Sequence, residues 1–465
     1  MDSKTKIICT IGPASERRNT LREMLRAGMD AIRINASHGT MDEYRQIISN
    51  VRSLSDIPII LDIIGPEIRI KSKEELMLRK GLEFEVGFDK SHDRYITFDF
   101  YDHVKRGDHI LLADGLLYTR VVGKKNHTLT LKSTSEGLLK VNKSASVPGR
   151  RFDVKLFSKY DLKLIEFAKR LKLDFISMSF VRGSDDVLKL RKILGNSGIG
   201  IISKIENVDG VRNIDSIIGV SDGIMVARGD LGVDLPPQKL PMVQKDIIRR
   251  CNIVGMPVTV ATEMLASMVE KPRPSRAEAS DVANAVLDGA DSVMLSDETT
   301  VGAYPVEAVS MMSRILLEVE PHVRTTLPME ETRSVSESIA RAVSNTCSHL
   351  KIDVIVTFTR SGHTSKLVSR YRPRQDIIAV TSDPKLKRML DLVYGVRPVV
   401  YEDMRLRDRT YNCARFLHKT GRINKSDRVL FTAGAYSMKQ HRTNLLEIHR
   451  IDDLFDYYRR NSLIR

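Results

Sequence analysis

The sequence predicts an α/β fold: a (β/α)8 TIM barrel with an inserted all-β lid domain and a C-terminal doubly wound α/β domain. Three observations lead to this prediction. Short apolar runs alternate with helix-spaced segments through most of the chain up to about residue 330. One long stretch of period-two residues interrupts the alternation. A second strand–helix series follows near the end of the chain.

Eight short runs have the apolar, β-branched composition of buried parallel strands. They are residues 6–11, 31–35, 57–62, 174–179, 199–204, 223–226, 257–261 and 291–295. Helix-spaced segments lie between them, among them residues 20–28, 161–171, 184–194, 208–218, 238–254 and 275–287. Eight such strand–helix units predict a closed barrel, whose active site lies at the carboxyl ends of the strands.

The interruption, residues 69–149, contains period-two runs such as RYITFDF but no helix-length pattern, and Asp114-Gly115 is a hairpin turn signal. Because it directly follows the third strand, we expect it to hang over the rim of the barrel and to exclude water. The expected domains are a discontinuous barrel, the inserted lid and a C-terminal regulatory and oligomerisation domain. Their ranges are 1–67 with 151–330, then 68–150, and 331–465.

The net charge of +15 is concentrated near the C-terminus, since residues 333–465 hold 26 Lys and Arg against 13 Asp and Glu. A basic surface attracts phosphorylated ligands or is only a solvated face. Without Trp or an aromatic-rich basic stretch, we expect no nucleic-acid partner. The scattered cysteines, the lack of a signal-peptide pattern and the lack of any run near ~18 apolar residues predict a cytoplasmic protein without a membrane partner.

Polar residues follow the predicted barrel strands. Lys204 and Glu206 end the fifth strand on the same side, and Asp230 follows the sixth. Two carboxylates suit a hard ion such as Mg²⁺, and a lysine beside them suits a transferring phosphoryl group. The other polar residues at strand ends are Asn35, Asp62, Thr262, Glu263, Ser296 and Glu298. Purely structural strands have no reason to gather such residues at one rim, so the pattern favours a site.

A second candidate site is the loop that joins the predicted strand 353–357 to the predicted helix 364–370. Its hydroxyl and glycine residues are Thr359, Ser361, Gly362 and Thr364. Such a loop can bind phosphate through hydroxyls and backbone N–H groups, but the same composition also caps a helix. The pattern alone leaves both interpretations open.

Several segments closely resemble the pyruvate kinases. They are KIICTIGPAS, AIRINASHGT, GPEIR, IISKIEN with SDGIMVARGDLGV, ATEMLASMVEKPRPSRAEASDVANAVLDGAD, and SRYRPRQDIIAVT. Motifs in register over nearly the whole chain are far more specific than any one of them. The resemblance implies Mg-dependent (or Mn-dependent) transfer of the phosphoryl group of phosphoenolpyruvate to ADP, giving pyruvate and ATP in the last step of glycolysis. It also implies a homotetramer and a phosphorylated effector at the C-terminal domain.

The resemblance further implies roles for individual residues. Glu206 and Asp230 hold Mg²⁺, and Lys204 stabilises the phosphoryl group in flight. Substrate binding falls to Arg33, Lys204, Gly229, Asp230 and Thr262, and nucleotide binding to Asn35, His38, Arg69 and Lys143. Thr262 and Ser296 stand where the family places substrate contact and proton delivery, although each hydroxyl is also suited to cap the next helix.

A potassium site is implied as well. Its ligands are Asn35, Ser37, Asp62 and the backbone carbonyl of Ile63. Family members that work without potassium tend to carry a lysine where this chain has Glu67, so K⁺ is the expected second cation. The alternative is that Asp62 and Glu67 pair with nearby arginines such as Arg33 and Arg69.

This chain departs from the usual pattern of the family at two positions. Asp297 stands where the family commonly has glycine, and Ile64 where it has lysine.

Two other functions are alternatives to phosphoryl transfer. A barrel lyase or aldolase also uses a carboxylate-held metal beside an enolate, but it has little use for a large inserted domain. A non-catalytic module that binds phosphorylated ligands would be favoured if the lysine and carboxylates of the core were absent, and all are present.

Overall fold

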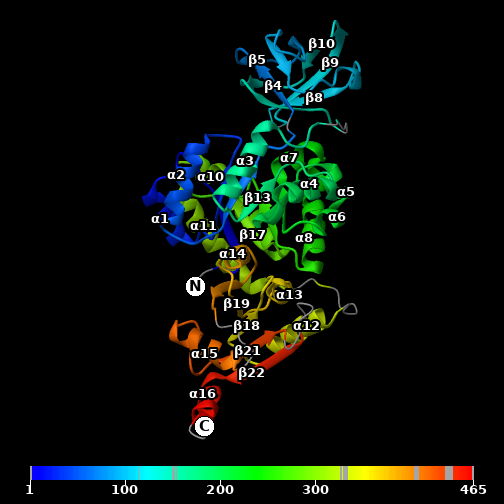
Figure 1. The fold of residues 1–465 in the computed structure, drawn as a ribbon. Coiled ribbons are helices and arrows are strands. Elements are labelled where there is room, and N and C mark those ends of the chain that lie inside the picture. The colour runs from blue at the N-terminus through cyan, green and yellow to red at the C-terminus, as the bar shows by residue number, and fades with distance from the viewer. Residues whose placement is uncertain are drawn as a thin grey trace.

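The structure is a computed structural model in which three parts of the chain are stacked along one axis (Figure 1). It describes residues 3–66, 68–113, 115–148, 152, 154–324, 327, 334–402, 408–434 and 443–462. The inserted β domain lies at one end, the barrel in the middle and the C-terminal α/β domain at the other end. Separate hydrophobic clusters fill the barrel, the insertion and the C-terminal domain.

A closed barrel forms the central part, with parallel strands in the order β1-β17-β16-β15-β14-β13-β3-β2. The strands are β1 (Lys6–Thr10), β2 (Ala31–Asn35), β3 (Ile59–Ile63), β13 (Phe175–Met178), β14 (Gly200–Ile205), β15 (Gly223–Ala227), β16 (Val258–Ala261) and β17 (Ser292–Leu295). Each lies at nearly the same residues as a predicted run, so the predicted barrel is confirmed. Parallel strands with helices on their outer side are buried on both faces, which explains their continuous apolar composition.

Helices cover the outside of the barrel (Figure 1). They are α1 (Arg18–Ala27), α2 (Met41–Arg52), α3 (Lys159–Arg170), α4 (Ser184–Leu194), α5 (Val208–Arg212), α6 (Ile214–Ile218), α7 (Arg228–Asp234), α8 (Leu240–Val254), α9 (Arg276–Leu287), α10 (Asp297–Thr300) and α11 (Pro305–Val319). The single helix predicted over 208–218 is wrong, because Asn213 leaves the helical conformation and separates α5 from α6. The helix predicted over 238–254 begins at Leu240, after a short 3-10 turn.

The interior of the barrel changes from apolar to charged along its axis. An apolar layer that includes Ile8, Ile202 and Met225 continues into Leu392 of the C-terminal domain. At the carboxyl ends of the strands, buried charged side chains such as Lys204 replace this layer. The fold therefore places ionic groups at one end of a dry interior, where their interactions are strong.

The inserted domain is antiparallel. Its strands are β4 (Arg69–Ser72), β5 (Leu76–Leu78), β6 (Glu83–Val86), β7 (Arg94–Ile96), β8 (His109–Leu112), β9 (Leu117–Lys125), β10 (Thr128–Ser133), β11 (Gly137–Leu139) and β12 (Lys143–Ser146). They form a sheet in the order β6-β10-β9-β8-β12-β4-β7 and a ribbon of β11 with β5. The predicted hairpin joins β8 to β9, with Gly115 in the turn at φ +80°; Asp114 lies outside the described residues. A Cβ at Gly115 would touch Val233 of α7, so this turn reaches the barrel.

The C-terminal domain is an open α/β sheet, as predicted. Its elements are α12 (Val335–His349), β18 (Val354–Phe358), α13 (His363–Ser369), β19 (Asp376–Thr381), α14 (Pro384–Leu390), β20 (Val396–Val400), α15 (Arg409–Lys419), β21 (Arg428–Ala433), β22 (Leu445–Arg450) and α16 (Ile451–Ser462). The strand order is β20-β19-β18-β21-β22, and only β22 runs antiparallel to its neighbour.

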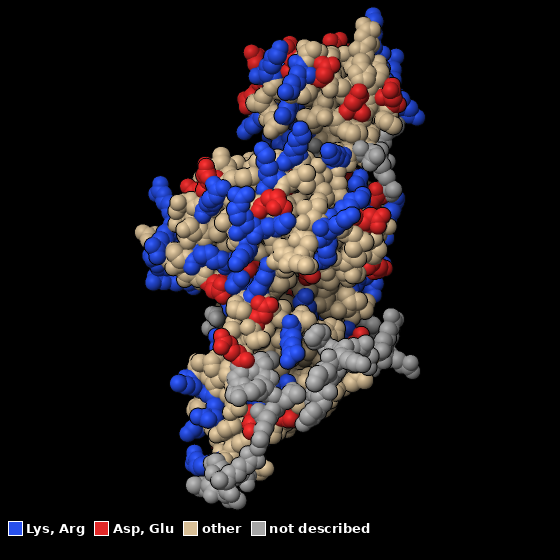
Figure 2. Space-filling view, in the orientation of Figure 1, with Lys and Arg blue, Asp and Glu red and all other residues tan. Residues whose placement is uncertain are grey.

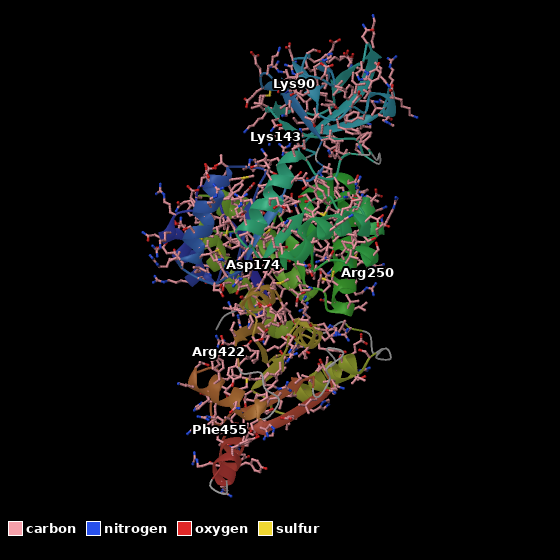
Figure 3. All side chains as sticks on the ribbon, viewed as in Figure 1. Lys90, Lys143, Asp174, Arg250, Arg422 and Phe455 are labelled. Carbon is pink, nitrogen blue, oxygen red and sulfur yellow. The ribbon has the colours of Figure 1, made fainter. Side chains whose placement is uncertain are left out.

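Ion pairs with two buried aspartates join this domain to the amino ends of two barrel strands. Arg372 Nη1 lies 2.9 Å from Asp291 Oδ1, just before β17. Arg388 Nε lies 2.7 Å from Asp174 Oδ1, just before β13, and Figure 3 shows Asp174 near this boundary. The C-terminal domain is thus fixed to the end of the barrel opposite the charged rim. Among the helices of the described ranges, none combines the length and apolar composition that a bilayer span requires.

Candidate active site

Lys204 lies at the centre of a charged cluster at the carboxyl ends of the barrel strands. Its ammonium lies 2.8 Å from Glu206 Oε1 and 3.3 Å from Asp62 Oδ2, and it donates a hydrogen bond to Ser179 Oγ at 2.9 Å. Lys204, Glu206 and Asp62 are all buried. Alternation along β14 places Lys204 and Glu206 on the same side, as the sequence predicted.

Burial and neighbouring charges act in opposite directions on this cluster. Burial alone would lower the pKa of Lys204, but Asp62 and Glu206 outweigh it and raise that pKa, so the ammonium stays charged. Burial raises the pKa of Glu206 to about 7, against the attraction of Lys204 and with the help of Asp230. Burial also acts to raise the pKa of Asp62, yet Lys204 and Arg33 outweigh it and lower that pKa.

Glu206 has the properties of a ligand for a divalent cation. Its Oε2 accepts the Phe180 N–H at 2.7 Å, whereas Oε1 is buried and no donor of the described residues reaches it in hydrogen-bond geometry beyond the ion pair with Lys204. A cation bound here with Asp230, in the first turn of α7, would favour the ionised carboxylates. The described ranges contain no group of three or more His, Cys, Asp and Glu suited to a metal. Two carboxylates are sufficient for Mg²⁺, because substrate oxygens and water complete its coordination.

Arg33 and Asp62 extend the cluster across β2 and β3. Arg33 Nε donates to Asp62 Oδ2 at 2.7 Å, and Nη1 donates to Thr10 Oγ1 at 3.1 Å. The sequence left open whether Asp62 binds potassium or pairs with an arginine, and this contact is the pairing with Arg33. Glu67, which the same alternative paired with an arginine, lies outside the described residues. The planar guanidinium has the donor geometry that suits a phosphate group.

The predicted potassium ligands lie on neighbouring strand ends. Asn35 pairs with Asp62 in the register of β2 and β3. Asn35 Oδ1 accepts the Ser37 N–H at 3.2 Å, and the Ile63 carbonyl accepts the Ser179 hydroxyl at 2.8 Å. The structure therefore brings the predicted residues together, with the Asp62 carboxylate engaged by Arg33 and Lys204.

Thr262 follows β16, and Ser296 follows β17. Thr262 Oγ1 accepts the Gly229 N–H at 2.9 Å. Gly229 was expected to bind the substrate, and here its N–H is bonded within the protein, because the turn after β16 places the Thr262 hydroxyl over it. Ser296 precedes α10 without a side-chain cap, and its buried Oγ has no partner among the described residues. The helix-cap interpretation of Ser296 is therefore wrong.

The predicted nucleotide contacts are divided between two parts of the molecule. His38 is exposed on the barrel, where its carbonyl accepts the Tyr44 hydroxyl. Arg69 begins β4 and donates to the Asn142 carbonyl at 3.0 Å, and Lys143 begins the adjacent strand β12. Figure 3 shows Lys143 at the end of the inserted domain that faces the barrel. Arg69 and Lys143 thus lie together opposite the barrel rim.

Positive charge also covers the side of the barrel that is visible in Figure 2, up to this rim. Figure 2 shows Lys and Arg side chains over the visible face of the barrel up to its junction with the inserted domain. The net charge of residues 1–332 is close to zero, so it did not reveal the excess of Lys and Arg on this face of the barrel. A basic surface beside the rim raises the local concentration of anionic substrates.

Thr10 and Ser179 are two rim residues that were not predicted from the sequence. Thr10 ends β1 and accepts from Arg33, while Ser179 follows β13 and accepts from Lys204. Both are polar residues at a strand end, so the rule that located the other rim residues also identifies these two.

The predicted effector loop precedes α13. Thr359 Oγ1 accepts the Gly362 N–H at 2.8 Å, and Thr364 Oγ1 shares a hydrogen bond of 2.6 Å with Thr443 Oγ1. Gly362 has φ +81°, and Ser361 is exposed. The Thr359 hydroxyl therefore stabilises the loop, and the Thr364 hydroxyl joins α13 to Thr443, which leaves Ser361 as the exposed one.

Comparisons with known proteins agree over almost the entire chain. The family model described as pyruvate kinase, barrel domain, matches residues 2–309, and the pyruvate kinase alpha/beta domain model matches residues 337–449. A pyruvate kinase of Sporosarcina psychrophila is 41% identical over 97% of this chain and 81% of its own length. Pyruvate kinases of Staphylococcus epidermidis (strain ATCC 35984) and Staphylococcus aureus (strain MRSA252) are 40% identical over the same shares. The chain therefore belongs to the pyruvate kinase family and is a phosphotransferase.

Proposed function

We propose that the protein transfers the phosphoryl group of phosphoenolpyruvate to ADP at the cluster around Lys204, giving pyruvate and ATP. The observation that carries the proposal is the buried ammonium of Lys204, charged and 2.8 Å from Glu206, at the carboxyl rim of the barrel. A fixed positive charge in a dry site stabilises the negative charge that donor and acceptor oxygens share during transfer.

Glu206 and Asp230 are the proposed ligands of Mg²⁺ or Mn²⁺. Glu206 Oε1 is buried and pairs with the Lys204 ammonium, but it accepts from no further donor of the described residues, which supports this assignment. When bound, the ion neutralises charge on the substrate oxygens that it contacts. The protein itself contributes the two carboxylates and the Lys204 ammonium, which offsets part of their negative charge.

Arg33 is the proposed phosphate contact. It reaches the rim already aligned by Asp62 and Thr10, so little side-chain freedom is lost when a phosphate accepts its remaining donors. Thr262 and Ser296 are the proposed groups for substrate contact and for proton delivery to the enolate carbon that transfer leaves behind. The Ser296 hydroxyl, for which the described part of the chain offers no hydrogen-bond partner, supports this role.

ADP is proposed to bind between the barrel and the inserted domain. Its contacts would come from Asn35 and His38 on the barrel and from Arg69 and Lys143 on the insertion. In this arrangement the inserted domain covers the nucleotide and keeps water from the phosphoryl group, which limits hydrolysis.

A coupled assay of pyruvate formation from phosphoenolpyruvate, with and without ADP and with and without Mg²⁺, tests the proposal. We expect pyruvate only when both ADP and the metal are present, with ATP formed in equal amount. Pyruvate formed at the same rate without ADP, together with inorganic phosphate, would show that water accepts the phosphoryl group and would refute transfer to ADP.

Potassium is expected to increase turnover. The oxygens of Asn35, Asp62 and Ile63 lie on adjacent strand ends, and isoleucine supplies its carbonyl as well as threonine does. The measurement compares kcat in potassium chloride and in tetramethylammonium chloride at equal ionic strength. Equal rates in the two salts would rule out stimulation by potassium.

The C-terminal domain is proposed to bind a phosphorylated effector, in a cytoplasmic homotetramer. The exposed Arg360 and Ser361 and the basic character of the domain support an anionic ligand. In a panel of sugar phosphates and nucleotides, at least one is expected to shift substrate half-saturation and to raise Tm. Light scattering is expected to give four copies. A panel without any shift in either quantity contradicts the effector proposal.

A further inference from the structure

The turn after β16 has a backbone conformation that its residues disfavour. Thr262 and Glu263 have φ of +68° and +54°, both in the left-handed region. A residue branched at Cβ, such as threonine, is a genuine outlier there, and such strain persists only where the surroundings hold it. Because this turn carries the proposed substrate contact Thr262, the groups that hold it bear on catalysis.

Arg228 holds this turn from the neighbouring strand. It is the first residue of α7, directly after β15, and its side chain is buried. Its Nη2 donates to the Thr262 carbonyl at 2.7 Å and to the Glu263 carbonyl at 3.0 Å, and Nε donates to the Thr262 carbonyl at 3.2 Å. Asp281 Oδ2 of α9 fixes Nη1 at 2.5 Å. One guanidinium therefore binds the carbonyls of both left-handed residues.

Glu298 holds the far end of the same turn from the other neighbouring strand. It is buried, and its Oε1 accepts the Leu265 N–H at 3.0 Å. Its Oε2 accepts the Ser296 N–H at 2.7 Å. Arg228, which follows β15, and Glu298, which lies after β17, therefore hold the turn from both sides. Neither residue belongs to the turn.

We propose that Arg228 is a positioning residue, which acts through the strained turn to aim the Thr262 hydroxyl at the substrate. In this geometry Thr262 Oγ1 accepts the Gly229 N–H, so the hydroxyl proton points away from Gly229 and is available for a substrate oxygen. Arg228 touches no reacting atom in this scheme. The inference rests on the proposed role of Thr262 in the phosphotransfer reaction.

Arg228→Lys tests this role, because lysine keeps the positive charge but loses the fork that binds two carbonyls. We expect kcat to fall about 10- to 100-fold, because a small misplacement of a substrate contact slows the reaction by that much. The KM for ADP is expected to change much less. In a Thr262→Ala background the same change is expected to lower kcat by less than about two-fold, because Arg228 acts through Thr262.

Glu263→Gly provides a rescue that only the strain explanation predicts. Glycine adopts a left-handed φ without steric cost, and the Glu263 side chain is exposed. Added to Arg228→Lys, this change is expected to restore a large part of the lost turnover. Ile217→Val, in α6, is the matched control, because it truncates a buried side chain away from the turn.

Three results would overturn the inference. One is an equal loss of kcat from Arg228→Lys with and without Thr262, and another is a failure of Glu263→Gly to restore turnover. The third is a similar loss of kcat in Ile217→Val at an equal fall in Tm, which would show a general effect of stability. Failure of the proposed function is distinguishable, since the wild-type protein would then form no ATP in the same assay.

Discussion

Lys204→Met is expected to lower kcat by about 10²- to 10³-fold, the largest effect of any single substitution proposed for this protein. Methionine has a similar length but no charge, so the charge shared between donor and acceptor oxygens loses its fixed partner. The fold should remain, because Arg33 still pairs with Asp62, and Glu206, whose pKa burial already raises to about 7, can take up a proton.

Steady-state kinetics with phosphoenolpyruvate and ADP, together with thermal unfolding, measure this effect. Lys245→Met, which removes an outer ion pair between α8 and Asp288, is the matched control and should leave kcat nearly unchanged. If Lys204→Met and Lys245→Met both keep most of the wild-type kcat, then the Lys204 ammonium has no role in transfer.

Glu206→Gln is expected to have the second largest effect, through the metal. The amide keeps the size of the side chain and can still accept the Phe180 N–H, but it removes the negative charge that a divalent ion requires. We expect the Mg²⁺ concentration for half-maximal activity to rise strongly and kcat at ordinary Mg²⁺ to fall about 100-fold.

Binding of Mn²⁺, followed by electron paramagnetic resonance without substrate turnover, separates the metal site from catalysis. Glu166→Gln removes an exposed carboxylate of α3 that pairs with Lys169, so this control should bind Mn²⁺ like the wild type. Unchanged Mn²⁺ affinity in Glu206→Gln would refute the assignment of this carboxylate as a ligand.

Much of the fold could be predicted because burial leaves a local pattern in the sequence. A parallel strand covered on both faces needs apolar, β-branched residues in a continuous run, and residues 223–226 illustrate this, since β15 is Gly223–Ala227. The period of two also predicted that Lys204 and Glu206 point to the same side, and their charged groups lie 2.8 Å apart. The break between α5 and α6 was missed because Asn213 is only a weak local signal.

The sequence also predicted which residues line the rim but not what they contact. A residue at a strand end faces the rim whatever its neighbours are, so position alone identified Asp62, Thr262 and Ser296. Their partners come from other strands: Arg33 binds Asp62, Gly229 binds Thr262, and Ser296 Oγ has no partner within the described residues. Such pairings depend on the register between strands, which a local pattern does not record.

By itself, then, the sequence determined the barrel, the interruption by β strands, the C-terminal sheet and the row of polar strand ends, because each follows from periodicity or burial over a few residues. Only the tertiary structure decided the left-handed conformation of Thr262 and Glu263 and the hold of Arg228 on their carbonyls. Neither residue favours that conformation on its own. The conformation exists because a guanidinium more than thirty positions earlier in the chain, brought beside the turn by barrel closure, binds both carbonyls.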